Sequence, residues 1–267
     1  MNDVSLHYVE AGSGPETIVF SHGYLMSHRM YDDQITALNA SARVIAFDHR
    51  CHGDSEKVQI EFALQDLVDD AAALIRETCD GPVHFVGMST GGFVGMRLAL
   101  YQPGLIKSLV LIDTSADYED PKALRRNKLL LAALGVFGFR PVINQAMSIL
   151  MGASFLKDPK RQEQVGVWKS YIMSLDIKAI RQFGLAIFSR DSVLDELKKK
   201  DDFVPTQIIV GEVDKATPVR NATDMQNAIS SSNLTVVLRA GHSSPIEEPQ
   251  IVTGVLQAFF KRIGAFD

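Results

Sequence analysis

Gly87-Met88-Ser89-Thr90-Gly91 is the stretch that decides how this chain of 267 residues is expected to fold. It follows the apolar run Val83-His84-Phe85-Val86, which is typical of a buried strand, and it precedes a helical pattern that ends near Tyr101. A serine on a tight turn between a strand and a helix forms a nucleophile elbow, in which a strained backbone exposes the hydroxyl. The flanking glycines leave room where the strand and the helix cross closely. Ser89 is therefore the candidate nucleophile.

The spacing G-x-S-x-G also occurs by chance in glycine-rich turns, so the pentapeptide alone is a weak signal. Its context is more informative. A strand before the serine, a helix after it, and an acid and a histidine further along the chain in that order are independent requirements of the elbow.

Seven short segments rich in β-branched residues are predicted to be strands. Several are continuous apolar runs, a pattern that indicates strands buried on both faces of a parallel sheet. We expect the first two to form a hairpin. The segments are Val4–Val9, Thr17–Ser21, Arg43–Phe47, Val83–Met88, Ser108–Ile112, Thr206–Val210 and Leu234–Leu238.

Helical patterns separate these strands. Alternation of strands and helices predicts an α/β fold with a doubly wound, mostly parallel sheet that is covered on both faces. The helices are predicted at Tyr31–Ala40, Phe62–Thr78, Gly91–Tyr101, Arg220–Ile229 and Gln250–Ile263.

Residues 117–202 break the alternation, because four helical patterns occur there without a convincing strand. Such a length is too great for an ordinary connection. We expect a helical cap at 117–202, inserted into a core formed by 1–116 and 203–267. The predicted cap helices are Leu124–Leu134, Pro141–Met151, Gln162–Ser174 and Ala179–Ser189.

The cap segment carries many large apolar side chains: Phe137, Phe139, Met147, Met151, Phe155, Trp168, Phe183 and Phe188. Two interpretations are open. Most of these side chains could form the small core of the cap itself. Alternatively, some face Ser89 and build an apolar acyl pocket together with Tyr24 and Met88.

A serine hydroxyl needs a base within hydrogen-bond reach, and the base needs a carboxylate that orients it. His242 directly follows the last predicted strand, at the sheet edge where Ser89 also lies, so it is the candidate base. The other histidines near strands are expected to be structural. His22 is expected to shape its loop, His49 and His52 lie in a polar turn, and His84 lies at the wrong end of its strand.

The candidate acid is Asp214, in the turn after the strand Gln207-Ile208-Ile209-Val210. Asp113 is the alternative, because it ends the preceding strand at the same edge. Glu212 is a third candidate but is closer to its strand.

An acyl-transfer site also needs two N–H donors for the developing oxyanion. The backbone N–H of Thr90, next to the nucleophile, is expected to be one donor. The backbone N–H of Tyr24, in the loop His22-Gly23-Tyr24, is expected to be the other. The Tyr24 phenol could contact substrate or pack under the cap.

Composition narrows the functional classes. The formal net charge is −5 and no basic stripe is present, so nucleic acid is not an expected partner. The two cysteines, Cys51 and Cys79, suggest neither a metal site nor a disulfide framework. The N-terminus lacks the pattern of a signal peptide, and no apolar run is long enough to span a membrane. We therefore expect a cytoplasmic protein.

Together these motifs resemble the α/β-hydrolase superfamily over nearly the whole chain. His22-Gly23-Tyr24 resembles its oxyanion loop, and the segment from Phe47 to Ser55 resembles its D-x-R-G-x-G-x-S turn, except that Cys51 replaces a glycine. The segment from Gly211 to Pro218 resembles the acid turn. Ala240-Gly241-His242 through Glu247-Glu248-Pro249 resembles the histidine loop. The pattern is most similar to small bacterial carboxylesterases, arylesterases and enol-lactonases with a helical cap.

This resemblance implies hydrolysis of a small-molecule carboxylic ester with a short to medium acyl chain, through an acyl-enzyme and without a cofactor or metal. Two alternatives stay open. The same residues could open lactones, cleave C–C bonds or carry out perhydrolysis. A ligand sensor with slow turnover is the alternative from a different class.

Overall fold

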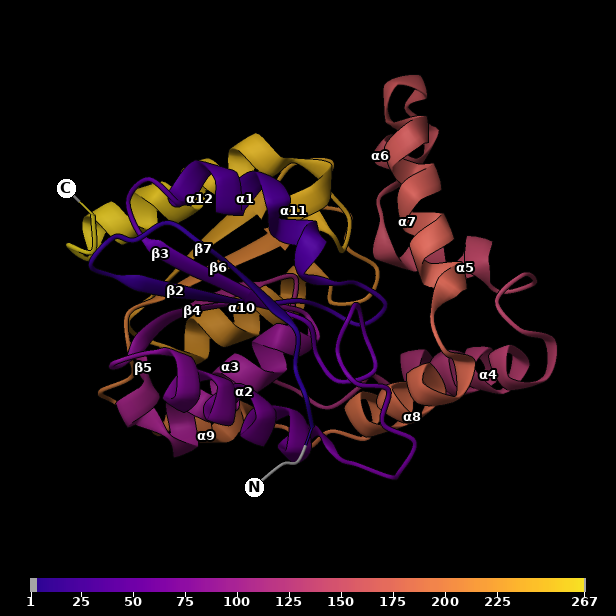
Figure 1. The fold of residues 1–267 in the computed structure, drawn as a ribbon, viewed down its shortest axis with the longest axis horizontal. Helices are drawn as coiled ribbons and strands as arrows, with labels where there is room; N and C mark the ends of the chain where they lie inside the picture. The colour runs from indigo at the N-terminus through magenta and orange to yellow at the C-terminus, as the bar shows by residue number, and fades with distance from the viewer. Residues whose placement is uncertain (1–3, 267) are drawn as a thin grey trace.

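The computed structural model describes residues 4–266, which form a seven-stranded sheet in the order β1-β3-β2-β4-β5-β6-β7 (Figure 1). β1 pairs antiparallel with β3, and every other neighbouring pair is parallel. The strands are β1 Tyr8–Ala11, β2 Thr17–Ser21, β3 Arg43–Phe47, β4 Val83–Met88, β5 Ile106–Ile112, β6 Thr206–Gly211 and β7 Ser232–Val237.

The first predicted strand is the one that differs most from the structure. It was expected over Val4–Val9 in a hairpin with the second strand, whereas β1 spans Tyr8–Ala11 and pairs with β3. β2 lies between β3 and β4 and forms parallel ladders with both, so it has no free edge for β1. β1 pairs instead with the outer edge of β3, the strand next to β2.

Helices cover both faces of the sheet (Figure 1). Within β2, β4, β5 and β6, alternate side chains belong to two separate buried clusters, which explains the continuous apolar runs. α1 (Asp32–Leu38) and α12 (Pro249–Arg262) pack on one face. The other face is covered by α2 (Leu64–Thr78), α3 (Thr90–Tyr101) and α10 (Val219–Ala228). Among the described residues, no helix has the length and apolar character needed to cross a membrane.

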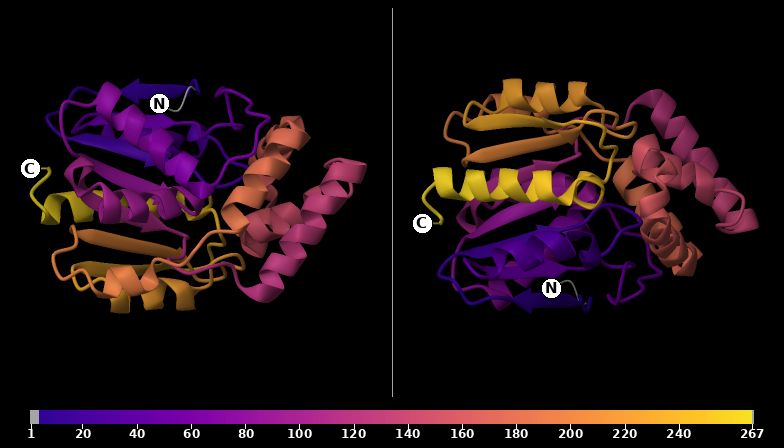
Figure 2. Two further views of the ribbon diagram at one scale, coloured as in Figure 1. Left: turned by 90° about the horizontal axis from the view of Figure 1, so that it is seen from below. Right: turned by 90° about the horizontal axis from the view of Figure 1, so that it is seen from above.

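The segment between β5 and β6 forms helices that stand beyond one end of the sheet (Figure 2). We call the helices α4 to α8 the cap. They are α4 Pro121–Phe137, α5 Ile143–Leu150, α6 Ala153–Lys157, α7 Gln162–Ser174 and α8 Ile177–Phe188. The short helix α6 was not predicted, nor was α9 (Leu194–Lys198), which packs beside α10 on the core.

Most of the large apolar side chains of the cap are buried, among them Trp168 and Phe183, whereas Phe137 is 71% exposed. Phe139 and Phe188 also line the cavity described below. Most of these side chains are therefore packing residues, and the binding of an acyl group by Phe139 and Phe188 stays a prediction.

Close backbone approaches fix the junction of β4 and α3. A Cβ atom at Gly91 would collide with the backbone carbonyl of Ser21 at the end of β2, and one at Gly87 would collide with the carbonyl of Gly91. Rigid backbone, rather than a flexible side chain, occupies the space in both cases. The glycines around Ser89 are thus required by the packing of the helix against the sheet.

We predict that Gly91→Ala lowers the free energy of unfolding by ~1–3 kcal/mol, because the added methyl group must displace the end of β2. Denaturant unfolding measures the loss. Gly104→Ala is the matched control, since nothing lies within 4 Å of a Cβ atom there. Equal stability of Gly91→Ala and Gly104→Ala would contradict the close approach.

Candidate active site

Ser89 lies at the sharp turn between β4 and α3, with φ 51° and ψ −110°. A positive φ is unfavourable for a residue with a side chain and costs ~1–3 kcal/mol. Hydrogen bonds hold the turn. The Ser89 N–H donates to the carbonyl of Ile112 at 2.9 Å, and the Ser89 carbonyl accepts from the Thr114 hydroxyl at 2.7 Å.

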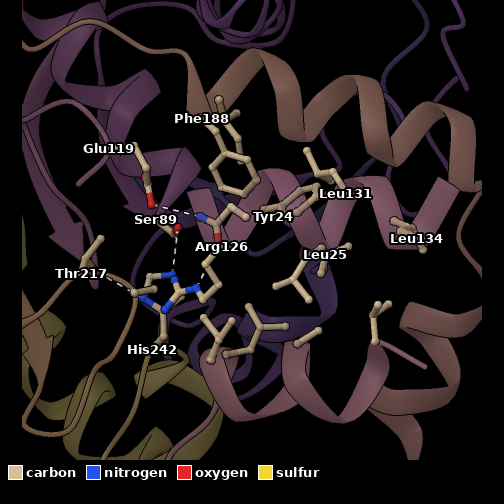
Figure 3. A pocket seen from close by; sticks show the side chains of 18 of the residues that line it. Tyr24, Leu25, Ser89, Glu119, Arg126, Leu131, Leu134, Phe188, Thr217 and His242 are labelled. Atoms are coloured by element: carbon tan, nitrogen blue, oxygen red, sulfur yellow. Dashed lines mark hydrogen bonds between the residues drawn. The ribbon is translucent and has the colours of Figure 1, made fainter. Parts of the chain in front are cut away.

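His242 links Ser89 to a carboxylate. Its Nε2 lies 3.0 Å from the Ser89 Oγ (Figure 3). Its Nδ1 lies 2.8 Å from Oδ2 of Asp214. All three side chains are buried or nearly so. The structure therefore brings together the predicted nucleophile, base and acid in one chain of hydrogen bonds, although they are far apart in the sequence.

Hydrogen bonds within the turn after β6 orient the Asp214 carboxylate toward the imidazole. Its Oδ1 accepts from the backbone N–H groups of Ala216 and Thr217, and its Oδ2 accepts from the Thr217 hydroxyl at 2.8 Å. These bonds leave Oδ2 facing the imidazole, which fixes the proton of His242 on Nδ1 and leaves Nε2 free to accept the serine proton.

The two other acid candidates have different contacts. Asp113 is fully buried and accepts from the Gly211 N–H at 2.7 Å and from the Ser244 N–H and hydroxyl at 2.9 and 2.6 Å. It thereby joins the ends of β5 and β6 to the histidine loop. Burial, together with the nearby Asp214 carboxylate, raises the pKa of Asp113 to about 7. Glu212 is exposed and accepts from the Arg239 N–H.

Opposing effects act on the pKa of His242. Burial disfavours the imidazolium and by itself lowers this pKa. The Asp214 carboxylate acts in the other direction, through its charge and its hydrogen bond, and Asp113 and Glu247 add to it. The net result is a His242 pKa above its ordinary value of 6.5.

The loop after β2 passes directly beside the serine. A Cβ atom at Gly23 would lie 3.1 Å from the Ser89 Cβ, so a larger residue would press on the nucleophile. The N–H groups of Tyr24 and Thr90 donate to no other group in the described part of the chain. The Tyr24 phenol packs under the cap, where it donates to the Ile180 carbonyl at 2.9 Å and its ring stacks on Phe183.

The remaining histidines support loops and strands. His22 receives a hydrogen bond from the His49 N–H at 2.9 Å, in agreement with its expected role in shaping the loop. His52 accepts from the Leu25 N–H at 3.1 Å. His84 contacts Ser108 and Glu16, away from the serine. Burial lowers the pKa of His22, His49, His52 and His84, so they are held as neutral acceptors and donors.

The turn from Phe47 to Ser55 keeps a left-handed residue where glycine was expected, since Cys51 has φ 69°. A residue with a side chain therefore adopts a strained conformation at this position. One group of described side chains has the composition of a metal site: His7, His28 and Asp48, whose ligand atoms lie within 4.8 Å of one another. Asp48 already accepts from both rings and from the His28 and Asp54 N–H groups. This arrangement explains the turn without an ion.

An apolar cavity of about 120 Å³ opens at Ser89 and His242, between the core and the cap (Figure 3). Tyr24 lines it as expected. Met88 does not, because this side chain is fully buried in the sheet, whereas Leu25 and Phe93 do line the cavity. The apolar wall comes from the cap: Leu130, Leu131, Leu134, Phe139, Val142 and Leu150.

Several polar residues at this cavity were missed from the sequence. Glu119, Arg126, Asn127 and Arg190 line it near the start of α4. The spacing of Arg126, Leu130 and Leu134 at every fourth residue places them on one helix face and could have revealed Arg126. Arg190 has no comparable local signal, because α8 ends at Phe188 before it.

Glu247 is a further residue whose role was missed. Its buried carboxylate accepts from the Gly241 N–H at 2.9 Å and the Ser243 N–H at 3.2 Å, on either side of His242. The same carboxylate accepts from the Gly152 N–H of the cap at 2.9 Å. One side chain therefore holds the histidine loop and attaches the cap to it.

Comparison with known proteins identifies the family. Residues 16–249 match the family model described as alpha/beta hydrolase fold. The chain belongs to this family. Because its relatives are named as hydrolases, it is a hydrolase.

Two relatives and one solved structure illustrate the likeness. The chain is 25% identical over 256 residues to 3-oxoadipate enol-lactonase 1 of Acinetobacter baylyi, covering 94% of this chain and 92% of the relative. It is 26% identical over 258 residues to the pimeloyl-[acyl-carrier protein] methyl ester esterase of Aeromonas hydrophila, covering 93% and 96%. The crystal structure of the enol-lactonase from Burkholderia xenovorans LB400 superposes with a TM-score of 0.89 at 22% identity, covering 97% and 98%.

The two aspartates are predicted to respond differently to replacement. Asp214→Asn should lower kcat on the order of 10⁴-fold, by analogy with the serine-protease triad, because the imidazole loses its orienting carboxylate. Asp113→Asn should mainly lower stability, by ~1–3 kcal/mol, since buried donors lose an acceptor. Ester hydrolysis and thermal unfolding of both variants give the comparison, and a larger kcat loss for Asp113→Asn would move the acid to that position.

The pH dependence is predicted from the raised pKa of His242. The imidazole must be neutral to accept the serine proton, so kcat/KM on a neutral ester should rise with pH through a midpoint above 6.5. In Asp214→Asn the residual activity should have a lower midpoint, because the main charge that favours the imidazolium is lost. A flat profile from about pH 5 to about pH 9 would exclude His242 as the base.

Proposed function

We propose that this protein hydrolyses carboxylic esters of small molecules with short to medium acyl chains, through an acyl-enzyme on Ser89. The observation that carries the proposal is the continuous hydrogen-bonded chain from the Ser89 Oγ through His242 to Asp214. Acyl transfer needs this combination of a hydroxyl that faces the cavity, a base in contact with it and an oriented tautomer.

The first half of the reaction forms the acyl-enzyme. His242 Nε2 removes the proton of the Ser89 hydroxyl as the oxygen attacks the ester carbonyl. The oxyanion of the tetrahedral intermediate accepts hydrogen bonds from the N–H groups of Tyr24 and Thr90. The start of α3 directs the positive end of its dipole toward the same oxygen. His242 then gives its proton to the leaving alcohol.

The second half releases the acid. Water enters where the alcohol has left, and His242 removes its proton as the water oxygen attacks the acyl carbon. Collapse of the second tetrahedral intermediate returns the proton to the Ser89 Oγ. Asp214 keeps the imidazole oriented in both halves and stabilises its positive charge, without taking the proton itself.

Lactone hydrolysis is a second candidate. A relative at 25% identity is named as an enol-lactonase, and a lactone presents the same carbonyl to Ser89 while its alcohol stays attached to the acyl group. Parallel assays of an open ester and of a lactone of equal carbon number separate the two. A ligand sensor would show little more than one turnover with either substrate.

The cavity supports short acyl groups. Its volume of about 120 Å³ is close to the ~150 Å³ of an apolar cavity that holds one benzene molecule. Each methylene that fits gains roughly 0.8 kcal/mol of burial, and the gain ends where the cavity ends.

We predict that kcat/KM for p-nitrophenyl esters peaks at short acyl chains and falls toward palmitate. Rates across the ester series give the test.

We also predict that Ser89→Ala abolishes turnover with the fold intact. Turnover of the variant is measured, and circular dichroism spectra check its fold. A large share of wild-type turnover in Ser89→Ala would refute the serine mechanism.

Two variants of α4 test whether the acyl chain binds along the cavity wall. Leu134→Trp, on the cavity wall, should move the optimum to shorter acyl chains, whereas Leu129→Trp should not, because Leu129 is 72% exposed on the same helix. A preference for palmitate, or an equal effect of both variants, would show that the acyl chain does not bind along this wall.

A further inference from the structure

Arg126 lies at one end of the cavity wall. It occupies the same face of α4 as Leu130 and Leu134, and all three line the cavity together with Ser89 and His242 (Figure 3). From Arg126 to Leu134 the helix rises roughly 12 Å. A ligand of that length can therefore contact the apolar wall with one end and the guanidinium with the other.

The charge of Arg126 is not matched by the protein. Arg190, which lines the same end of the cavity, pairs with Glu119 at 2.7 Å, and Glu119 also accepts from Asn127 at 3.1 Å. In the described part of the chain, Arg126 forms no ion pair and donates only from Nε, to the Asn127 amide oxygen at 3.3 Å. Its two terminal nitrogens keep the forked donor geometry that fits a carboxylate.

The surroundings of Arg126 favour an anion. A groove of about 440 Å³ continues from this end of the cavity. Its positively charged side chains are Lys122, Arg126, Arg190, Lys215 and Arg220. Its acids are Asp117, Glu119 and Asp120, of which Glu119 is held by Arg190 and Asp120 caps α4. A cationic groove on a chain of net charge −5 locally favours anionic ligands.

We propose that Arg126 forms an anion subsite, and that the preferred substrates are esters that carry a carboxylate on one side of the scissile bond and an apolar group on the other. The inference rests on the proposed ester hydrolysis. The apolar group lies against Leu130 and Leu134, and the carboxylate forms a forked hydrogen bond with Arg126. Hydrolysis then consumes one water and yields an acid and an alcohol, one of which retains the carboxylate.

Two substrate pairs test the subsite. Monomethyl adipate and methyl hexanoate differ by a carboxylate on the acyl side, and carboxymethyl butyrate and ethyl butyrate differ by a carboxylate on the alcohol side. The ratio of kcat/KM for the anionic ester to that for its neutral partner is measured for the wild type, Arg126→Gln and Arg125→Gln. The variants remove the same charge from adjacent positions, but Arg125 is exposed and does not line the cavity.

We expect the ratio to fall about tenfold in Arg126→Gln for one of the pairs and to stay unchanged in Arg125→Gln, because only Arg126 contacts the carboxylate. The pair that responds identifies the side of the ester that carries the anion. Arg126→Lys keeps the charge without the forked geometry, so its ratio should lie between those of the wild type and Arg126→Gln. It also provides the test if Arg126→Gln does not fold.

The inference is overturned if the ratios of Arg126→Gln equal those of the wild type for both pairs, or if Arg125→Gln lowers them as much. A wild type that hydrolyses the neutral esters but shows this result retains the proposed function and loses the anion subsite. A folded wild type that hydrolyses none of the four esters overturns the proposed function itself.

Discussion

The strained turn at Ser89 is the constraint on which the rest of the structure depends. A residue at φ 51° costs ~1–3 kcal/mol and persists only where its surroundings leave no alternative. Those surroundings are buried parallel strands on either side of β4, close backbone contacts at Gly87 and Gly91, and hydrogen bonds from and to the neighbouring β5 segment. The sheet thus stabilises a conformation that the turn would not hold alone, and the hydroxyl is presented at the edge where β6 and β7 deliver Asp214 and His242.

The two buried acids near His242 have different hydrogen-bond partners. Asp214 faces the imidazole, and its remaining hydrogen bonds orient it. Asp113 instead accepts three hydrogen bonds that tie β6 and the histidine loop to the end of β5. Both negative charges favour the imidazolium, so the carboxylate that does not touch His242 still contributes to the raised pKa of the base.

The sequence was informative wherever the signal was local. The apolar runs with glycine-rich turns led to β2 through β7. The positions of Ser89, Asp214 and His242 after β4, β6 and β7 led to one sheet edge. Contacts between residues that are distant in the sequence could not be predicted from local patterns. β1 does not pair with β2, because β2 already has a partner strand on each side. Glu247 contacts Gly152 across 95 positions of the chain. The spacing of Arg126 and Leu134 indicates a shared face of α4, but this face lines the cavity, with Leu129 left exposed, because of how α4 packs against α8.

The bonds of Glu247 also limit how the cavity can open. Its carboxylate is buried and takes one hydrogen bond from the cap, at Gly152, and two from the loop that carries His242. A rigid swing of the whole cap would separate Gly152 from this carboxylate, and the loss of a charged, buried hydrogen bond costs ~1.5–3 kcal/mol. The junction of α5 and α6 is therefore a fixed point of attachment between the cap and the loop that carries the base. The Tyr24 hydroxyl holds α8 in the same way, through the Ile180 carbonyl, so the cap is bound to the core at these two separate points.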